Sequence, residues 1–364
     1  MTHTIEASAA TRPFDQARAD AFVGKVVGDT VGLATTAMAS IGDRLGLFKD
    51  LATSGPSTST ELATRTGTHE RYIREWLGAM ANAGYLEYEP GTRRFTLPAE
   101  HAPVLAQETG PVFFGGVHEE FVGLLGSFEK LLGHVRSGGG LGLEDYPDSM
   151  YEGIDRFTAG WFENLLIPVW LPLVPQVVAK LQEGARAADV GCGRGRALIK
   201  LAQAFPESRF VGYEIYGPNV DAAVRNVRAA GLQDRITIRH ADASEGLDGR
   251  YDVITTFDVV HDAVDPRGML RAIHNALQPD GSYLCLEINC SDKLEENHGP
   301  IGALLQSCSV LLCLTLSLAA NGEGLGTLGL HEPKLRELGT EAGFSSVRRI
   351  PMENPFNSLY ELTP

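Results

Sequence analysis

The second half of the chain alternates short apolar runs with amphipathic stretches, and this order limits the possible folds more than any other feature. Runs typical of strands cover residues 187–190, 209–215, 235–241, 251–257 and 282–288, and stretches with helical spacing cover 197–205, 219–231 and 266–277. Strands separated by helices favour a parallel sheet with helices on both faces. Because 331–344, 345–352 and 357–362 then read as a helix and two strands, the sequence predicts an α/β domain over about 183–364.

The first third of the chain has a different pattern, which predicts a winged helix from about residue 37 to residue 98. Residues 35–51 place apolar side chains at helical spacing, a short helix starts near Thr60, and a longer one closes at Gly84. Two short strands, 85–89 and 93–97, flank a turn. Helices joined by a tight turn and followed by a hairpin are typical of this motif. We expect a winged-helix domain over 1–105 and a helical connector over 106–182.

Charge and cysteine content limit the partners that we expect. The chain has 31 basic and 46 acidic side chains, a net charge of −15, which disfavours nucleic acid and anionic lipid surfaces. The second helix of the winged-helix motif mixes Glu70 and Glu75 with Arg71 and Arg74, so dimerisation or capping is favoured over DNA recognition. The five cysteines include no CxxC pair, so neither disulfides nor a metal site is expected.

The N-terminal residues predict a cytoplasmic protein. Glu6 and Asp15 lie in the first sixteen residues, where a signal peptide would have a basic start and an apolar stretch.

A glycine-rich turn follows the first strand of the α/β domain. The segment DVGCGRGRA, residues 189–197, spaces its glycines as GxGxG and has Arg196 where a dinucleotide fingerprint has its third glycine. The Asp189 carboxylate would disfavour a pyrophosphate in this turn, but it suits a ligand with an ammonium beside a carboxylate. We therefore expect the turn to bind a zwitterionic amino-acid tail.

Acidic residues also end the next two strands. Glu214 follows the turn by a little more than twenty residues, where a carboxylate can accept hydrogen bonds from both ribose hydroxyls. Asp242 can accept from an adenine amine, and Ala243 can donate its backbone N–H. A lone acid is more often a solvated loop residue. Three acids at successive strand ends instead indicate a ligand site.

The segments DVGCGRG, GYEIY, HADA and FDVVHD, in this order and spacing, resemble class I S-adenosylmethionine-dependent methyltransferases over about Leu181 to the C-terminus. The resemblance implies a Rossmann-like, doubly wound, seven-stranded sheet and S-adenosyl-L-methionine as cofactor. The residues that it implies around the cofactor are Asp189, Gly191 and Gly193 at the methionine moiety, Glu214 at the ribose, Asp242 and Ala243 at the adenine, and Phe257 near the sulfonium. Together with the winged helix, the chain is similar to small-molecule O-methyltransferases of plants and bacteria, which implies a homodimer.

His261 is the candidate general base. It follows the strand 251–257 at the edge of the sheet where the glycine turn lies, and imidazole suits proton removal from a hydroxyl acceptor. In the resembling enzymes the catalytic histidine opens an HDW motif, which is HDA here, and a glutamate at the end of the next strand orients it. That glutamate corresponds to Glu287, and a second one would fall near Glu323. Alternatively, His261 caps the following helix or binds a loop carbonyl.

Residues 301–320 form an uncharged run of twenty, long enough to cross a bilayer as a helix. The run lies between a central strand and the last strands, so a spanning helix would separate strands that must pair. We therefore expect a buried helix and no membrane. In the resembling enzymes an insertion here, about 291–330, walls the substrate site and packs across the dimer. The residues expected to face an apolar acceptor or a partner chain are Trp161, Leu304, Cys308, Leu311, Leu312 and Thr315, and His298 and His331 flank the run.

The predicted function is methyl transfer from S-adenosylmethionine to a small, apolar or aromatic molecule, at oxygen. Transfer to nitrogen, carbon or sulfur with the same cofactor remains an alternative, as does a winged-helix regulator with a ligand-sensing domain. A nicotinamide oxidoreductase is disfavoured by the GxGxG spacing and by Asp189.

Overall fold

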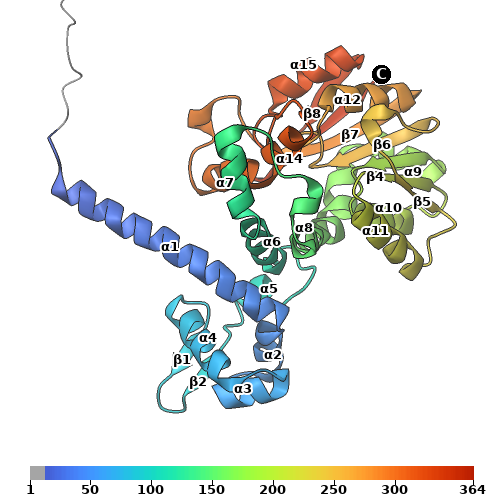
Figure 1. Cartoon of the computed structure of the whole chain (residues 1–364). Helices are drawn as coiled ribbons and strands as arrows, with labels where there is room; N and C mark the ends of the chain where they lie inside the picture. Colours follow the sequence, from blue (N-terminus) through green and yellow to red (C-terminus); the bar gives the residue numbers. More distant parts are fainter. Residues whose placement is uncertain (1–12) are drawn as a thin grey trace, which may run out of the picture. The chain divides into compact units, whose positions relative to one another are not determined.

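The computed structural model describes residues 13–364, and these form two compact units (Figure 1). The first unit ends at Pro98, and the second runs from Ala99 to Pro364. The domain limits at residues 105 and 182 remain predictions.

The first unit is the winged helix that the sequence predicts. Its elements are α1 (Gln16–Arg44), α2 (Leu47–Ser54), α3 (Ser59–Thr66), α4 (Glu70–Asn82), β1 (Glu87–Glu89) and β2 (Arg94–Thr96). The two strands pair antiparallel, with Tyr88 opposite Phe95. The single helix predicted over 35–51 was wrong, because the chain breaks at Gly46, which has φ 68 in the left-handed region that glycine favours. Instead, α1 begins at Gln16, nineteen residues before the predicted start at residue 35, which is roughly five turns of helix.

An aromatic contact holds the helices of this unit together. Phe48 of α2 and Trp76 of α4 meet edge to face with their ring centroids 5.1 Å apart, and both are buried. The Trp76 indole N–H donates to the Met38 carbonyl of α1 at 2.8 Å. Gly42, one turn further along α1, lies against the same ring. Three helices therefore converge on Trp76.

The second unit begins with helices and then builds a seven-stranded sheet. The helices are α5 (Ala102–Leu105), α6 (Gly115–Leu125), α7 (Phe128–Ser137), η1 (Leu143–Asp145), α8 (Asp148–Trp161), the π-helix η2 (Phe162–Trp170), η3 (Leu171–Leu173) and α9 (Pro175–Glu183). The sheet and its helices comprise β3 (Arg186–Val190), α10 (Arg196–Ala204), β4 (Arg209–Glu214), α11 (Gly217–Ala229), β5 (Ile236–His240), η4 (Ala243–Glu245), β6 (Tyr251–Phe257), α12 (Pro266–Ala276), β7 (Leu277–Ile288), α15 (Glu332–Ala342), β8 (Ser346–Ile350) and β9 (Asn357–Thr363).

The strand order is β5-β4-β3-β6-β7-β9-β8, with β5 to β7 parallel and β9 antiparallel to both neighbours. Alternate residues of the strands face opposite sides, as Val253 packs toward α9, α10 and η2 whereas Ile254 packs toward α12 and α15. The chain leaves β3 in one direction through β4 and β5 and then crosses to β6. This change of direction puts a ligand crevice outside the carboxyl ends of β3 and β6, and it confirms the predicted doubly wound fold.

The uncharged run forms consecutive helical segments, α13 (Pro300–Cys308), the π-helix η6 (Ser309–Cys313) and α14 (Leu314–Ala319), preceded by η5 (Leu294–Glu296). By length and composition Pro300–Ala319 could cross a membrane. Only 33% of its most apolar window is buried inside the protein. The prediction of a buried helix is therefore only partly right, since Ile301, Leu304 and Val310 are exposed. After the run, β9 returns to pair with β7 and β8 pairs with β9, so both strands join the sheet as predicted.

The Trp76 contact generates a stability prediction. In Gly42→Ala the new Cβ would overlap the Trp76 ring and lie 2.7 Å from Phe48, so we expect a loss of about 1–3 kcal/mol of unfolding free energy. Gly78→Ala in α4 is the matched control, because nothing lies within 4 Å of its Cβ position, and helix propensity should raise stability by about 0.5–1 kcal/mol. Urea denaturation followed by tryptophan fluorescence measures both; equal stabilisation by the two changes would contradict the packing described.

Candidate active site

The glycine turn after β3 opens its backbone toward the crevice. Gly191, Gly193 and Gly195 all have φ between 53 and 81, in the left-handed region. Gly191 also approaches Val259, where a Cβ would lie 2.6 Å from its methyl groups. Gly195 is the N-cap of α10, so the amides of the first turn of this helix point toward the turn. The local fold therefore requires glycine, and it presents N–H donors to a ligand.

Asp189 is the acid inside this turn, and it is 2% exposed. The Thr255 hydroxyl of β6 donates to its Oδ1 at 2.6 Å. Burial raises the pKa of Asp189 to about 7, the Thr255 hydrogen bond opposes the rise, and the neighbouring Glu214 carboxylate adds to it. A buried carboxyl of this kind gains most from a cationic partner.

Glu214, at the end of β4, braces the turn. Its Oε2 accepts from the Gly193 N–H and its Oε1 from the Tyr216 N–H, both at 2.8 Å. Burial raises its pKa, and these backbone hydrogen bonds oppose the rise. This bracing role was not predicted from the sequence. Each carboxylate oxygen can accept more than one hydrogen bond, so the contact is compatible with ribose binding.

Asp242 and Ala243 lie at the end of β5. Asp242 caps η4, accepting from the backbone N–H and the hydroxyl of Ser244 at 2.8 and 2.7 Å. Ala243 is buried at the first position of η4. Both lie beyond the carboxyl end of the sheet, where the sequence predicts them.

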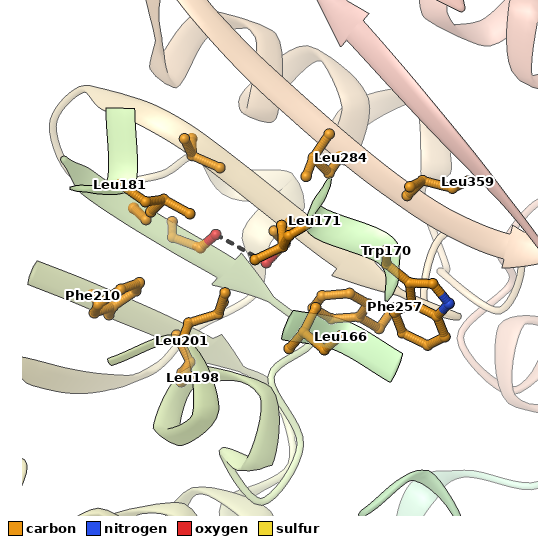
Figure 2. Close-up of a pocket in the computed structure, with 14 residues that line it drawn as sticks. Leu166, Trp170, Leu171, Leu181, Leu198, Leu201, Phe210, Phe257, Leu284 and Leu359 are labelled. Atoms are coloured by element: carbon orange, nitrogen blue, oxygen red, sulfur yellow. Dashed lines mark hydrogen bonds between the residues drawn. The ribbon is translucent and has the colours of Figure 1, made fainter. Parts of the chain in front are cut away.

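Phe257, at the end of β6, belongs to an aromatic cluster. Its ring centroid lies 5.2 Å from that of Phe162 and 6.4 Å from that of Trp170, both in η2. Figure 2 shows Phe257 beside Trp170. The apolar cavity beside them has about 20 Å³ of free space, which is room for about one water molecule. This cavity is therefore too small for a methyl acceptor. Trp161 packs edge-on against Phe157, 4.6 Å between centroids, next to the same cluster.

The structure brings His261 and Glu287 together. His261 is 4% exposed, and its Nδ1 lies 2.6 Å from Glu287 Oε2. The other Glu287 oxygen accepts from the backbone N–H groups of Val259 and Val260, at 3.3 and 2.8 Å. Since the carboxylate is the acceptor in all three contacts, Nδ1 is the donor, and Nε2 carries the lone pair of the neutral ring. The N-cap of α12 is Asp265, so the alternative in which His261 caps that helix was wrong.

Several titratable groups surround this pair. Burial lowers the pKa of His261, but Glu287 and Cys313 raise it, and the net shift is well above its ordinary value. Asp258 has φ 56 and accepts from the Asn357 side-chain amide at 2.8 and 2.9 Å. Burial, reinforced by Glu287, raises the pKa of Asp258 to about 7. The edge of β6 and β7 thus places one buried and one half-buried acid, Glu287 and Asp258, beside one imidazole.

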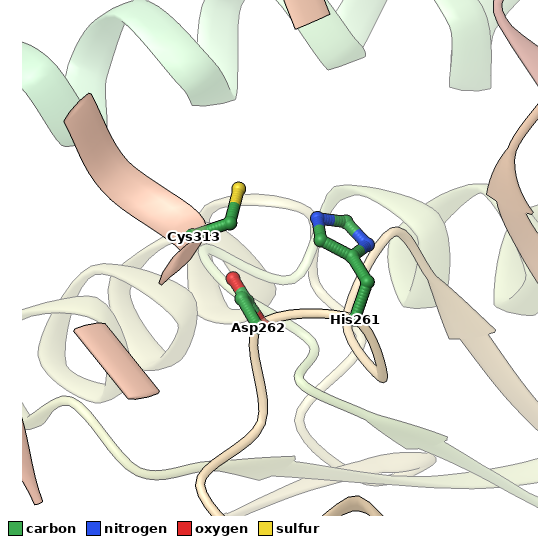
Figure 3. A group of neighbouring side chains, drawn as sticks. All are labelled: His261, Asp262 and Cys313. Atoms are coloured by element: carbon green, nitrogen blue, oxygen red, sulfur yellow. The ribbon is translucent and has the colours of Figure 1, made fainter. Parts of the chain in front are cut away.

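Cys313 was missed by sequence reasoning. Its thiol, on η6, lies beside His261 and Asp262, which follow β6 (Figure 3). The Ser317 hydroxyl of α14 donates to the Ala263 carbonyl at 3.0 Å and ties the helical insertion to the loop that bears His261. Since Cys313 lies in an uncharged run far along the chain, no spacing in the sequence links it to His261.

Other predicted residues lie elsewhere. Glu323 pairs with Arg267 at 2.9 Å, and its role beside His261 stays a prediction. His298 is exposed, with its Nδ1 2.5 Å from the Glu295 carbonyl, and His331 caps α15. Neither histidine therefore lies in the buried pair described above.

The predicted acceptor-facing residues are not all grouped together. Leu304 is exposed, and Cys308 is half-buried. Leu312 packs within the cluster formed by α6, α7 and α8, whereas the Leu311 carbonyl accepts from the Tyr146 hydroxyl at 2.6 Å. The Thr315 hydroxyl accepts from the Leu141 N–H at 2.7 Å. Their role at an acceptor stays a prediction.

Two family models match the chain. The Rv2258c-like winged HTH domain matches residues 33–107, and a methyltransferase domain matches residues 188–283. The first range covers the predicted winged helix, and the second covers the α/β pattern from β3 into β7.

The curated relatives that the chain matches differ in extent. The mitomycin biosynthesis 6-O-methyltransferase of Streptomyces lavendulae is 28% identical over 245 residues, which are 65% of this chain and 70% of that protein. Polyketide synthase ThaQ of Burkholderia thailandensis is 33% identical over 104 residues, 28% of this chain but only 5% of ThaQ.

Solved structures share the fold over almost the whole chain. The mitomycin 7-O-methyltransferase MmcR superposes with a TM-score of 0.68 at 24% identity and covers 96% of this chain and 100% of its own. Human N-acetylserotonin methyltransferase has a TM-score of 0.66 at 16% identity, covering 97% and 99%.

These matches agree with the strand order, the glycine turn and the winged helix described above. The chain therefore joins a winged helix-turn-helix domain to a methyltransferase domain, and in sequence and fold it is similar to S-adenosylmethionine-dependent O-methyltransferases.

Proposed function

We propose that this protein transfers a methyl group from S-adenosyl-L-methionine to an oxygen of a small apolar or aromatic molecule. The observation that carries the proposal is the buried His261–Glu287 pair at the same sheet edge as the glycine turn. The mitomycin methyltransferases that the chain resembles act at oxygen according to their names. Transfer to nitrogen, carbon or sulfur has no comparable support in the geometry.

The cofactor supplies an electrophilic methyl group on a cationic sulfur when it is bound. Asp189 suits its ammonium, and the amides beside Gly191 and Gly193 suit its carboxylate. We assign Glu214 to the ribose, and Asp242 with Ala243 to the adenine; the positions of these residues at the ends of β4 and β5 support this assignment. Human N-acetylserotonin methyltransferase, which shares this fold, was solved in complex with the same cofactor.

His261 is proposed as the general base. Because Nδ1 donates to Glu287, the ring is held in one orientation. In its neutral form, which the raised pKa favours only at higher pH, Nε2 can accept the proton of an acceptor hydroxyl as the oxygen attacks the methyl carbon. The Glu287 carboxylate then stabilises the imidazolium that forms. Holding donor and acceptor in line contributes further, since positioning alone can supply about 7–11 kcal/mol of a barrier.

A regulator that binds DNA is less well supported. On α4, Arg74 pairs with Glu70 at 2.7 Å and Arg71 pairs with Glu75, so the basic groups of this helix are matched by acids. With a net charge of −15, the chain has little excess positive charge to offer a phosphate backbone.

We also propose that the protein is a cytoplasmic homodimer. Helix α1 exposes a row of apolar side chains that a second copy could cover: Phe22, Val23, Val26, Val27, Val31 and Leu33. All five cysteines are free thiols, which fits a reducing compartment.

The cofactor proposal predicts a pH-dependent affinity. Because the pKa of Asp189 is about 7 in the free protein and an ammonium favours the ionised form, S-adenosylhomocysteine binding should release a proton, and its affinity should fall as the pH drops from about 8 to 6. Asp189→Asn should weaken binding roughly 10–100-fold and flatten this dependence. Calorimetry in two buffers of different ionisation enthalpy measures both effects. Asp221→Asn, an exposed acid on α11, is the control; a pH-independent wild type would contradict the role of Asp189.

If His261 is the general base, its replacement should lower the rate of methyl transfer without lowering the affinity for the cofactor. His261→Asn should lower kcat by about 10²–10⁴-fold while S-adenosylhomocysteine affinity changes little, and His298→Asn should behave as wild type. The assay transfers labelled methyl groups to a panel of hydroxylated aromatic compounds and locates the label by mass spectrometry. Turnover of His261→Asn within a few-fold of wild type would exclude the base role, and label on nitrogen or carbon would exclude oxygen as the acceptor atom.

The dimer proposal is tested on α1. The double change Val27→Glu and Val31→Glu should convert a dimer to a monomer in sedimentation velocity, because each charge would lie in the apolar row. Leu294→Glu, which alters a 76% exposed side chain of the second unit, is the control. A wild-type protein that sediments as a monomer at micromolar concentration would exclude the dimer.

A further inference from the structure

Three chemically different side chains meet at the carboxyl edge of β6. His261 and Asp262 come from the loop after this strand, and Cys313 comes from η6 in the helical insertion (Figure 3). One donor atom from each, an imidazole nitrogen, a carboxylate oxygen and a thiol sulfur, lies within 4.8 Å of the other two. His261 and Cys313 are buried and Asp262 is half-buried.

This donor set matches a particular class of metal ion. Nitrogen, sulfur and carboxylate oxygen are the ligands of Zn²⁺, and catalytic zinc sites use three protein ligands and leave a fourth position open. With bonds of about 2.0–2.3 Å, Zn²⁺ would hold three such atoms roughly 3.5 Å apart. Small side-chain rotations would therefore close the set around an ion. The thiol makes hard cations such as Mg²⁺ poor candidates.

The groups behind His261 are those that a metal-binding histidine usually has. Its Nδ1 donates to Glu287 at 2.6 Å, and Glu287 is itself held by the Val260 N–H at 2.8 Å. A carboxylate behind the ring fixes the tautomer and makes Nε2 a better ligand. Asp258, on that side of the ring, is bound by the Asn357 amide, so its oxygens are already engaged. The free nitrogen therefore belongs to the group with Cys313 and Asp262.

The backbone also holds the ligands in place. Ser317, one turn after Cys313, donates to the Ala263 carbonyl at 3.0 Å, and Ala263 follows Asp262 directly. The loop and the helix that supply the ligands are thus joined next to the site. The thiol and the imidazole are consequently held on facing elements, as a preformed site requires.

We propose that His261 Nε2, the Asp262 carboxylate and Cys313 Sγ form a binding site for Zn²⁺ or a cation of the same class. On binding, the Cys313 thiol loses its proton to solvent and its sulfur bonds to the metal as thiolate. The metal occupies the same nitrogen that proton abstraction needs, so metal binding and base catalysis exclude each other. The exclusion of base catalysis by the metal rests on the proposed function, whereas the metal binding itself does not.

The test uses Co²⁺ as a spectroscopic substitute for Zn²⁺ on the full chain. Metal-free protein is titrated anaerobically with Co²⁺, and absorbance is recorded for the thiolate-to-metal charge-transfer band and for the visible bands of tetrahedral cobalt. We expect both to saturate near about one equivalent and to vanish when Zn²⁺ is added. No acceptor or methyl transfer is involved, so this result is independent of the proposed function. A wild-type protein without the charge-transfer band overturns the proposal, whatever the variants do.

Variants identify the ligands. Cys313→Ser should abolish the charge-transfer band, and Glu287→Gln should weaken binding about 10–100-fold through the histidine. Cys308→Ser, which removes another thiol of the same helical run, is the matched control and should retain the band. Loss of the band in Cys308→Ser, or its survival in Cys313→Ser, would place the metal elsewhere and overturn the assignment. Asp262→Asn, checked by circular dichroism for folding, should also weaken binding; unchanged affinity removes Asp262 from the site and overturns the three-ligand proposal.

Discussion

At the carboxyl ends of β6 and β7, the arrangement of the loop and of His261 depends on one buried carboxylate, that of Glu287. It is 1% exposed at the end of β7, and it accepts hydrogen bonds from two backbone amides of the neighbouring loop and from His261. A buried charge is tolerated only when such partners compensate for its lost hydration. The same bonds therefore stabilise the acid, fix the loop after β6 and choose which nitrogen of His261 faces outward.

At the glycine turn, two buried carboxylates lie close together. Asp189 and Glu214 are both buried, and burial raises the pKa of each. The Glu214 carboxylate raises the pKa of Asp189 further, and the described contacts of the two acids come from hydroxyl and amide groups. A ligand with a positive charge relieves this repulsion, whereas a pyrophosphate would increase it. The electrostatics of the glycine turn thus favour the sulfonium cofactor over a dinucleotide, for a reason separate from the glycine spacing.

The helical insertion between β7 and β8 contacts both the loop that bears His261 and the helices α6 to α8. Its inner face carries Leu312 and Cys313, which pack against α6 to α8, while Ile301 and Val310 are exposed. Packing therefore explains the apolar residues on one face of this run, while the apolar residues on the other face are exposed to solvent. With Ser317 bonded to the Ala263 carbonyl, a movement of the insertion would also move the loop that bears His261.

The sequence by itself determined the fold class, the glycine turn and the acids at the strand ends. These follow from short-range patterns, because strand and helix periods are local and parallel strands bring their carboxyl ends to one edge. The pairing of His261 with Glu287 was expected from the resemblance to O-methyltransferases. The break at Gly46 was missed because apolar spacing continues across it, although the backbone there is left-handed. Only the tertiary structure placed Cys313 beside His261 and Glu323 with Arg267. Contacts between distant segments depend on how an insertion packs back onto the sheet, and no local pattern encodes that packing.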